Sequence, residues 1–183
     1  MIIATVLKSG GEYAVEHVHR LQGMIYNHIP HSMFVCFTDM DPCCQIVRLK
    51  NNFPGWWSKM ELFRMPGPLL YFDLDTIILK DMQKTISNVD GKAFVILRDF
   101  YRGKTNPLAM QSSVMYWSGD MSWLYLKYVT DPVFVGGDQE YIEKHVRGAE
   151  YWQDFTDAFA SYKVDIVTRG VRESDECVVF KKQ

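Results

Sequence analysis

Short apolar runs alternate with amphipathic segments along most of the chain. Residues 2–7 form an apolar run that is typical of a buried strand, and a glycine pair follows shortly after it. Between residues 12 and 29 the apolar positions recur at helical spacing until Pro30, which predicts a helix that ends there. Residues 33–38 predict a second strand. A strand, a helix and a strand at this spacing indicate a parallel α/β sheet.

The same alternation continues towards the C-terminus. Further strands are predicted over 45–49, 69–73, 93–97, 113–117, 164–167 and 177–180. Further helices are predicted over 56–64, 81–88, 120–128 and 140–145. No repeat, low-complexity tract or linker divides the chain. We therefore expect a single α/β domain over residues 1–183, with a central, mostly parallel sheet flanked by helices.

The segment 98–108 differs from the rest because it is polar and has no periodicity. It contains Gly103 and Pro107, which are typical of loops. We expect a mobile loop here, with Arg102 and Lys104 facing a ligand phosphate.

Two carboxylates interrupt the apolar run 69–79. Side chains two residues apart on an extended segment point to the same side, so Asp73 and Asp75 can converge on one cation. Ionised carboxylates beside a core are costly unless a cation compensates them. Magnesium and manganese are typically held by one or two carboxylates together with substrate phosphates. We expect a divalent metal site for a diphosphate ligand; the alternative is an Asp-x-Asp turn with no ligand.

Composition narrows the classes of partner. The chain has 20 Lys and Arg against 22 Asp and Glu, a net charge of -2, so no strong field favours nucleic acid or an anionic membrane. No apolar stretch reaches membrane-spanning length, and the N-terminal run is too short for a signal peptide, so we expect a cytoplasmic protein. The four cysteines include no C-x-x-C pair, which favours free thiols.

Four motifs occur in an order and spacing that resemble GT-A-fold nucleotide-sugar glycosyltransferases, nearest the glycogenin-like type. They are W-S-K-M-E-L-F at 57–63, L-Y-F-D-L-D-T at 70–76, Q-S-S-V-M at 111–115 and G-G-D-Q at 136–139. The resemblance covers most of the chain and is to the small members found in bacteria and their phages. It implies a GT-A domain that transfers a sugar from a nucleotide diphosphate, preferably UDP, to an acceptor hydroxyl. The implied metal is Mn²⁺ or Mg²⁺, and retention of configuration is favoured over inversion.

The resemblance also implies which residues bind the nucleotide and the metal. Asp75 would coordinate the metal, and Asp73 would contact the metal or the ribose. Thr5, Val6 and Lys8, at the end of the first strand, would line the pocket for the nucleobase and ribose. Nothing in these three side chains physically selects uracil over another base.

Five further positions would surround the donor sugar. Lys59 matches a lysine that approaches the donor, and the alternative is a solvated helix lysine. Ser112 and Ser113 would lie beside the sugar. Asp138 and Gln139 match an acidic-amide pair near the anomeric carbon, although Asp138 is also suited to capping a helix. If the reaction inverted configuration, Asp138 would be the candidate general base.

Two positions depart from the family pattern. Gln111 stands where relatives carry an asparagine that contacts the sugar. The family's C-terminal His-x-Gly-x-x-Lys-Pro segment is absent, and Lys181 stands at the place of its metal-binding histidine. An ammonium cannot coordinate a metal, so Lys181 either neutralises phosphate directly or belongs to a solvated basic tail.

Two other functions remain open at this point. A GT-A-like domain that binds a nucleotide or glycan without turnover agrees with the short chain and the missing histidine. A haloacid-dehalogenase-like phosphatase is favoured by the run Phe72-Asp73-Leu74-Asp75, but Ile77 stands where that family carries Thr or Val. A complete strand-helix-strand unit also precedes the motif, which argues against the phosphatase.

Overall fold

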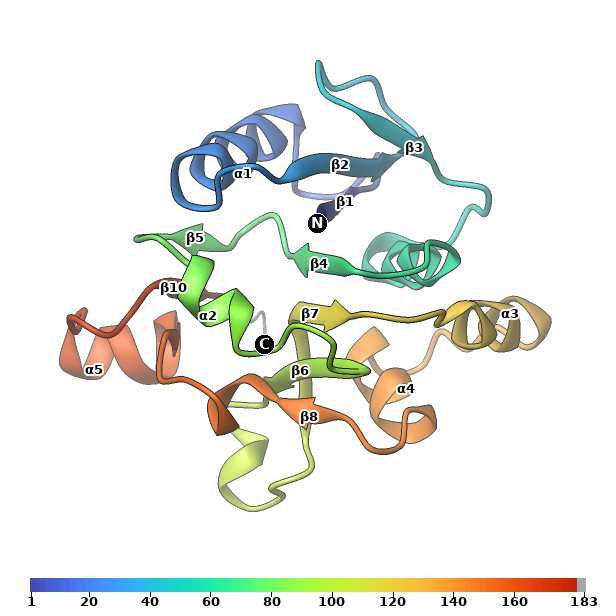
Figure 1. Ribbon diagram of the computed structural model, residues 1–183. Helices are drawn as coiled ribbons and strands as arrows, with labels where there is room; N and C mark the ends of the chain where they lie inside the picture. The colour runs from blue at the N-terminus through green and yellow to red at the C-terminus, as the bar shows by residue number, and fades with distance from the viewer. Residues whose placement is uncertain (181–183) are drawn as a thin grey trace.

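A seven-stranded mixed sheet forms the centre of the molecule in the computed structural model, which describes residues 1–180 (Figure 1). Its strands, in spatial order, are β3 (Ile46–Arg48), β2 (Met33–Thr38), β1 (Ile2–Leu7), β4 (Leu69–Phe72), β7 (Met110–Trp117), β6 (Phe94–Arg98) and β8 (Glu150–Tyr151). All neighbours pair in parallel except β7, which is antiparallel to both β4 and β6. The predicted α/β architecture with a mostly parallel sheet is confirmed.

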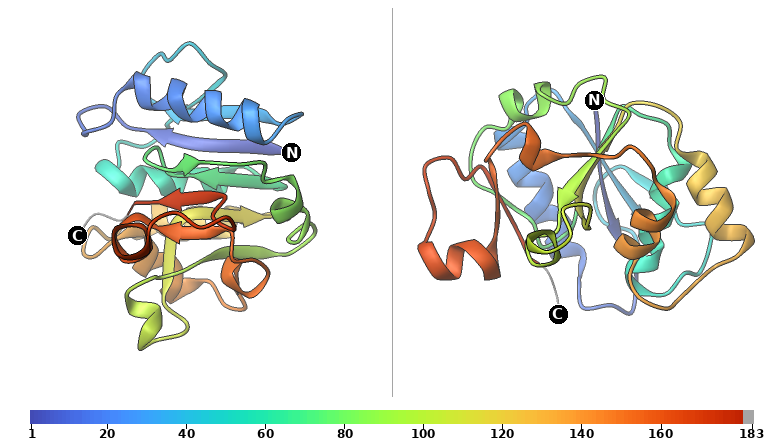
Figure 2. Two further views of the ribbon diagram at one scale, coloured as in Figure 1. Left: turned by 90° about the vertical axis from the view of Figure 1, so that its left-hand side faces the viewer. Right: turned by 90° about the horizontal axis from the view of Figure 1, so that it is seen from below.

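Two layers cover the sheet (Figure 1). On one side lie α1 (Val15–His28), the short helices α2 (Gln83–Ser87) and α5 (Val167–Arg169), and a small sheet of β5 (Ile77–Ile78), β10 (Cys177–Val179) and β9 (Phe159–Ser161). On the other side lie the 3₁₀-helical segment η1 (Gly55–Arg64), α3 (Ser122–Thr130) and α4 (Asp138–His145). The right-hand view of Figure 2, from below, shows the same two layers on opposite sides of the sheet. The layers bring η1 and α4 to one flank of β4.

Each face of the sheet has its own apolar core. On the α1 side, Val18, Leu21 and Ile25 are fully buried, because their spacing places them on one helical face against the sheet. On the other side, the aromatic ring of Phe63 packs on that of Trp117, with ring centroids 5.1 Å apart. β7 is buried along its whole length, from Met110 to Trp117, because it has a layer on both faces.

Several predicted boundaries shift, and one predicted strand is wrong. Residues 162–166 form a single π-helical turn that continues into α5, where the sequence predicted a strand over 164–167. Local hydrogen bonds favour the turn: the Asp165 carboxylate accepts from the Ser161 backbone N–H at 2.8 Å, and the Ser161 hydroxyl accepts from the Val164 N–H. Ser and Asp side chains commonly divert the backbone from a strand in this way.

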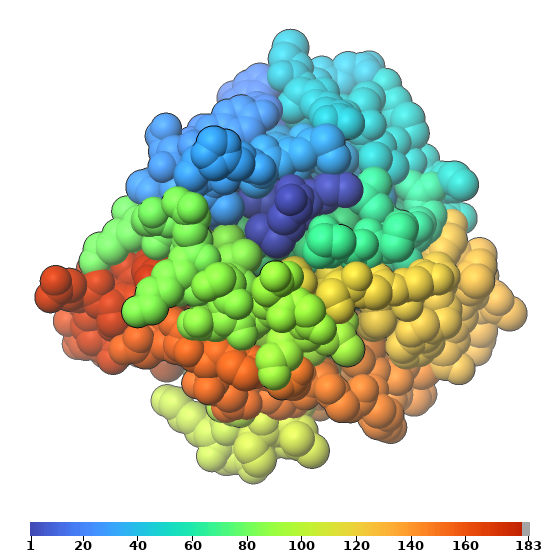
Figure 3. Space-filling view, in the orientation of Figure 1, coloured from blue at the N-terminus to red at the C-terminus, as the bar shows by residue number. Residues whose placement is uncertain are grey.

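The segment 98–108 projects from the body of the molecule, in yellow-green at the bottom of Figure 3, but its base is anchored. Arg102 lies 3.0 Å from the Asp99 carboxylate and 3.1 Å from that of Glu143 on α4, and donates to the Met110 carbonyl at 2.7 Å. Carboxylates on two elements therefore hold the Arg102 guanidinium, and the expectation that Arg102 and Lys104 face a ligand phosphate stays a prediction.

Replacing Arg102 with alanine is expected to lower the free energy of unfolding by about 1 kcal/mol, because the ion pairs are partly exposed. Urea unfolding measures the loss, and amide hydrogen exchange should rise within residues 99–109. Lys104→Ala is the matched control, since this residue lies on the same turn and is exposed. Equal exchange in both variants would show that Arg102 does not anchor the loop.

Candidate active site

Asp73 and Asp75 lie at the carboxyl end of β4, in the middle of the sheet. The Asp73 N–H donates to the Ser113 carbonyl at 2.9 Å, which extends the pairing with β7 by one residue. The Thr76 N–H then donates to the Asp73 carbonyl at 3.0 Å and closes a tight turn. Strand β4 therefore ends at the first carboxylate and the turn presents the second. This edge of the sheet is where α/β proteins commonly bind ligands.

Lys59, from η1, links three of the predicted site residues. Its ammonium nitrogen lies 3.0 Å from Asp73 Oδ1 and 3.0 Å from Asp138 Oδ2. It also donates to the Ser112 hydroxyl at 3.0 Å, and Ser112 in turn donates to Asp138 Oδ2 at 2.6 Å. One cation therefore joins η1, β4, β7 and α4.

The Lys59 side chain is only 8% exposed, so the alternative of a solvated helix lysine is wrong. Burial alone would lower its pKa, but the charges of Asp138 and Asp73 outweigh this effect and raise the pKa above its ordinary value. Lys59 is therefore charged at neutral pH. Asp138 is the first residue of α4, and the helix cap is Gly137, whose N–H donates to Glu140 at 2.9 Å. Asp138 is thus directed to Lys59 instead of capping the helix.

Asp75 has an unusual environment. Tyr13, from the loop before α1, donates its hydroxyl to Asp75 Oδ2 at 2.8 Å. The other oxygen, Oδ1, is buried and has no hydrogen-bond partner among residues 1–180. Burial and then the charge of Asp73 raise the pKa of Asp75 to about 6. A carboxylate with an unpartnered buried oxygen beside a second carboxylate is a place where a cation would relieve both costs.

The residues present fit a divalent metal that shares its coordination with a ligand. Asp73 and Asp75 supply two hard oxygen donors, and Asp75 Oδ1 is the unsatisfied one. Within residues 1–180 no group of three or more His, Cys, Asp or Glu side chains converges as a self-sufficient metal site. Two carboxylates with the remaining positions left to phosphate oxygens and water is the arrangement that magnesium commonly adopts.

The end of β1 lies beside this pair. The Thr5 hydroxyl is fully buried and donates to the Phe72 carbonyl at 2.9 Å, which ties β1 to the last residue of β4. Val6 is half-buried, and Lys8 forms an ion pair with Asp39 after β2. Burial opposes ionisation of Asp39, but the hydrogen bonds from Lys8 and Ser9 lower its pKa to about 2. The polar side chains of Thr5 and Lys8 at the end of β1 are therefore held in place by β4 and by the residue after β2.

The remaining predicted positions lie on β7 and α4, with one exception. Ser113 is buried, and its hydroxyl accepts from the Gln111 amide at 3.2 Å. Gln139 is half-buried on the first turn of α4, and its amide donates to Glu140 at 3.0 Å. Lys181 lies outside the described residues.

No protein-family model matches the sequence. No curated protein matches it either. Solved structures do resemble it, and glycosyltransferases are among them. GlyE of Streptococcus pneumoniae TIGR4 matches with a TM-score of 0.68 at 9% sequence identity, over 100% of this chain and 54% of GlyE. The galactosyltransferase LgtC matches with a TM-score of 0.65 at 10% identity, over 98% of this chain and 87% of LgtC. A glycosyltransferase involved in glycosylation of the major capsid of PBCV-1 matches with a TM-score of 0.59 at 10% identity, over 97% of this chain and 92% of that one.

The chain has the GT-A fold. At these identities the likeness shows the architecture alone. The chain spans about half the length of GlyE. In this GT-A domain no helix within residues 1–180 is long and apolar enough to cross a membrane.

Sequence reasoning missed two tyrosines that complete the site. Tyr71 donates its hydroxyl to Asp73 Oδ1, and its position two residues before Asp73 on β4 was a usable signal, because such residues share a strand face. Burial and the charge of Asp73 raise the pKa of Tyr71, so it remains a donor. Tyr13 had no such signal, because only the fold brings it to Asp75, 62 residues away.

Replacing Tyr13 with phenylalanine is expected to raise the pKa of Asp75 above about 6, because the lost hydrogen bond stabilises the ionised carboxylate. Carbon-13 NMR of the aspartate carboxyl signals across a pH titration measures the change. Tyr26→Phe is the control, since Tyr26 is 54% exposed on α1. An Asp75 midpoint that falls or stays constant in Tyr13→Phe would contradict the assignment.

Proposed function

We propose that the protein transfers a sugar from a nucleotide diphosphate donor, preferably a UDP-sugar, to an acceptor hydroxyl, with Mn²⁺ or Mg²⁺ held at Asp73 and Asp75. The observation that carries the proposal is the buried Lys59 ammonium between Asp73 and Asp138, next to the unpartnered Asp75 oxygen. The likeness to glycosyltransferases of the same fold supports it. One of them, LgtC, was solved with donor and acceptor sugar analogues.

The chemical demand in this reaction is the negative charge that develops on the departing diphosphate. A divalent ion on the carboxylate pair would supply part of the compensation as a Lewis acid. Lys59 supplies a second positive charge from the protein itself, and its position is fixed by contacts to three oxygens at 3.0 Å. A preorganised buried charge stabilises a transition state without reorganisation at the moment of reaction. Stabilisation of the leaving group is therefore the step that this site serves.

Asp138 and Gln139 are proposed to contact the donor sugar near its anomeric carbon, with Ser112 and Ser113 beside it. Asp138 is only 8% exposed in its side chain and is held by Lys59 and Ser112, so it acts as a fixed carboxylate. Gln139 is its neighbour on the first turn of α4. We propose retention of configuration, because this pairing of a carboxylate with an amide follows the glycogenin-like resemblance.

Binding of a nucleotide or glycan without turnover is the second candidate. It is favoured by one observation: the Lys59 ammonium is already paired with Asp73 and Asp138, so less of its charge is available to a departing diphosphate. A domain with this arrangement can bind a diphosphate while supporting little transfer.

Donor hydrolysis distinguishes the two candidates. The purified protein is incubated with UDP-glucose, UDP-galactose, UDP-N-acetylglucosamine, GDP-mannose or CMP-sialic acid, with Mn²⁺ or with a chelator, and the released nucleotide is quantified. The proposal expects metal-dependent release of UDP from at least one UDP-sugar. Tight binding of UDP with no release from any donor would instead assign the binding function, and binding that ignores Mn²⁺ would contradict the metal assignment.

A further inference from the structure

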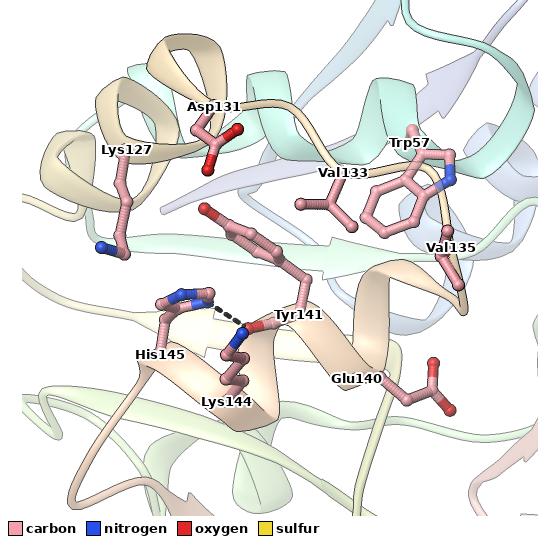
Figure 4. A pocket seen from close by; sticks show the side chains of 9 residues that line it. All are labelled: Trp57, Lys127, Asp131, Val133, Val135, Glu140, Tyr141, Lys144 and His145. Carbon is pink, nitrogen blue, oxygen red and sulfur yellow. Dashed lines mark hydrogen bonds between the residues drawn. The ribbon is translucent and has the colours of Figure 1, made fainter.

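A pocket of about 360 Å³ lies between α3 and α4, outside the carboxylate site (Figure 4). Its lining comes from η1, from the end of α3 with the loop that follows, and from α4: Trp57, Lys127, Asp131, Val133, Val135, Glu140, Tyr141, Lys144 and His145. The volume is in the range of small-ligand sites. None of these residues belongs to the donor site proposed above.

The pocket shares two structural elements with that site. Trp57 is two residues from Lys59, and Glu140 is two residues from Asp138. In Figure 4 Trp57 and Glu140 lie on the same side of the pocket as Val135, although apart from each other. The pocket and the donor site are therefore built on the same two elements, η1 and α4.

The floor of the pocket is aromatic and rigid. The Trp57 ring stacks on Tyr128 with centroids 5.3 Å apart and planes 10° apart, and the Tyr141 ring meets Trp57 edge-on at 6.4 Å. Trp57 and Tyr141 are 3% and 7% exposed. His145 packs against Tyr141 at 4.2 Å between ring centroids. Because these rings hold each other in place, the shape of the pocket is preformed.

The rim carries polar groups with free hydrogen-bonding capacity. Lys127, Asp131 and Lys144 are exposed, and none has a side-chain hydrogen bond or ion pair with any residue in 1–180. Figure 4 shows the Asp131 carboxylate directed toward the Tyr141 hydroxyl. The lining carries the ammonium groups of Lys127 and Lys144 together with the carboxylates of Asp131 and Glu140. A strongly charged ligand of either sign is therefore repelled by one of these two sets of charges. A neutral ligand rich in hydroxyls, which both donate and accept, satisfies all of these groups.

The remaining wall is apolar and uncovered. Val133 and Val135 are 39% and 86% exposed in the loop that leads to Asp138. Phe134, between them, is 51% exposed. Exposed apolar side chains grouped beside polar groups mark a binding surface. Carbohydrates present C–H faces and hydroxyl edges together, which matches this combination of wall and rim.

We propose that this pocket binds the acceptor saccharide. The pocket's affinity for a neutral saccharide follows from its lining alone, whereas the role as acceptor subsite rests on the proposed function. The two parts are tested by separate measurements.

Binding is tested first, without turnover. Methyl glycosides of glucose, galactose and N-acetylglucosamine are titrated to millimolar concentrations while backbone amide signals are followed by NMR. We expect the signals of residues 133–137 and 144–145 to shift, and Val135→Arg to abolish the shifts. Val167→Arg, at a valine that is 66% exposed on α5, is the matched control and should keep them. Absence of shifts with every glycoside, or shifts that Val135→Arg leaves unchanged, would overturn the proposal.

The acceptor role is tested by the ratio of transfer to hydrolysis for a UDP-sugar that the protein cleaves, with the bound glycoside as acceptor. Val135→Arg and Lys144→Ala are expected to lower this ratio about tenfold and to raise the acceptor KM, while Val167→Arg and Lys163→Ala leave both unchanged. An unchanged ratio in Val135→Arg would refute the acceptor role. If no donor is cleaved but glycosides still shift the signals, the proposed function fails and the saccharide site remains.

Discussion

Asp75→Asn is expected to reduce metal-dependent donor hydrolysis by about a hundredfold or more, because a neutral amide cannot replace a carboxylate beside a divalent ion and a diphosphate. Asp75 has the only buried carboxylate oxygen without a hydrogen-bond partner among residues 1–180. The measurement is the rate of UDP release at saturating Mn²⁺. Asp90→Asn, at an exposed position after α2, serves as the control. Hydrolysis within about threefold of wild type in Asp75→Asn would contradict the assignment.

The same substitution is expected to stabilise the metal-free protein. In the folded state Asp75 has a pKa of about 6, against 3.8 for the ordinary residue, so the folded state binds the proton more tightly than the unfolded chain does. Wild type therefore loses stability as the pH rises from 3.8 to about 6 and does not regain it above that range. The amide that Asp75→Asn introduces carries no charge, so the variant avoids this loss.

The expected gain for Asp75→Asn at pH 7.5 is about 1–3 kcal/mol in the free energy of unfolding, shrinking to zero below about pH 4. Urea unfolding with a chelator present, repeated across the pH range, measures it. A gain of equal size at every pH would show that the substitution acts through packing and not through the charge of Asp75. A loss of stability at pH 7.5 would show that other groups of the protein already compensate the charge of the Asp75 carboxylate. Function at the expense of stability is common at such sites.

Lys59→Met is the second large effect. The methionine keeps the apolar stem but removes the ammonium from between Asp73 and Asp138. Breaking a buried ion pair from one side leaves uncompensated charge, so the free energy of unfolding is expected to fall by about 3 kcal/mol. Donor hydrolysis is expected to fall about a hundredfold, because the leaving diphosphate loses a preorganised cation. Urea unfolding and UDP release measure the two effects on one preparation.

A double variant separates charge from packing. Lys59→Met leaves the buried Asp138 carboxylate without its cation. If this is what lowers the free energy of unfolding, the double variant Lys59→Met with Asp138→Asn should recover part of the stability but none of the activity. Lys84→Ala, at an exposed lysine on α2, controls for the general effect of removing a positive charge. Additive losses in the double variant would show that Lys59 and Asp138 are not energetically coupled.

Much of the architecture could be predicted from sequence because its signals are local. The run 2–7 is buried on both faces of the sheet, so its continuous apolar character identifies it as a strand. Val18, Leu21 and Ile25 bury one face of a helix, so their periodicity identifies it. Strands such as β8, with two residues, carry no periodicity of their own and exist only because a neighbour pairs with them. The strand predicted over 164–167 failed because side-chain hydrogen bonds of Ser161 and Asp165 override its apolar pattern.

The site shows the same division. Asp73 and Asp75 could be predicted because charged residues inside an apolar run are recognisable from the sequence alone. The burial of Lys59 was not, because nothing local distinguishes it from a solvated lysine; its neutralising partners are 14 and 79 residues away, as the numbering of Asp73 and Asp138 shows. The pocket between α3 and α4 was likewise invisible, since Trp57, Lys127 and Tyr141 meet only in the fold.

The central claim is that Asp73 and Asp75 hold a divalent ion together with a nucleotide diphosphate. Electron paramagnetic resonance of Mn²⁺ tests it most directly, because the sharp signal of the free ion disappears on binding. The account predicts that wild type with UDP removes one equivalent of Mn²⁺ per chain, that Asp75→Asn removes none at the same concentrations, and that Asp90→Asn behaves as wild type. Full Mn²⁺ binding by Asp75→Asn in the presence of UDP would contradict it.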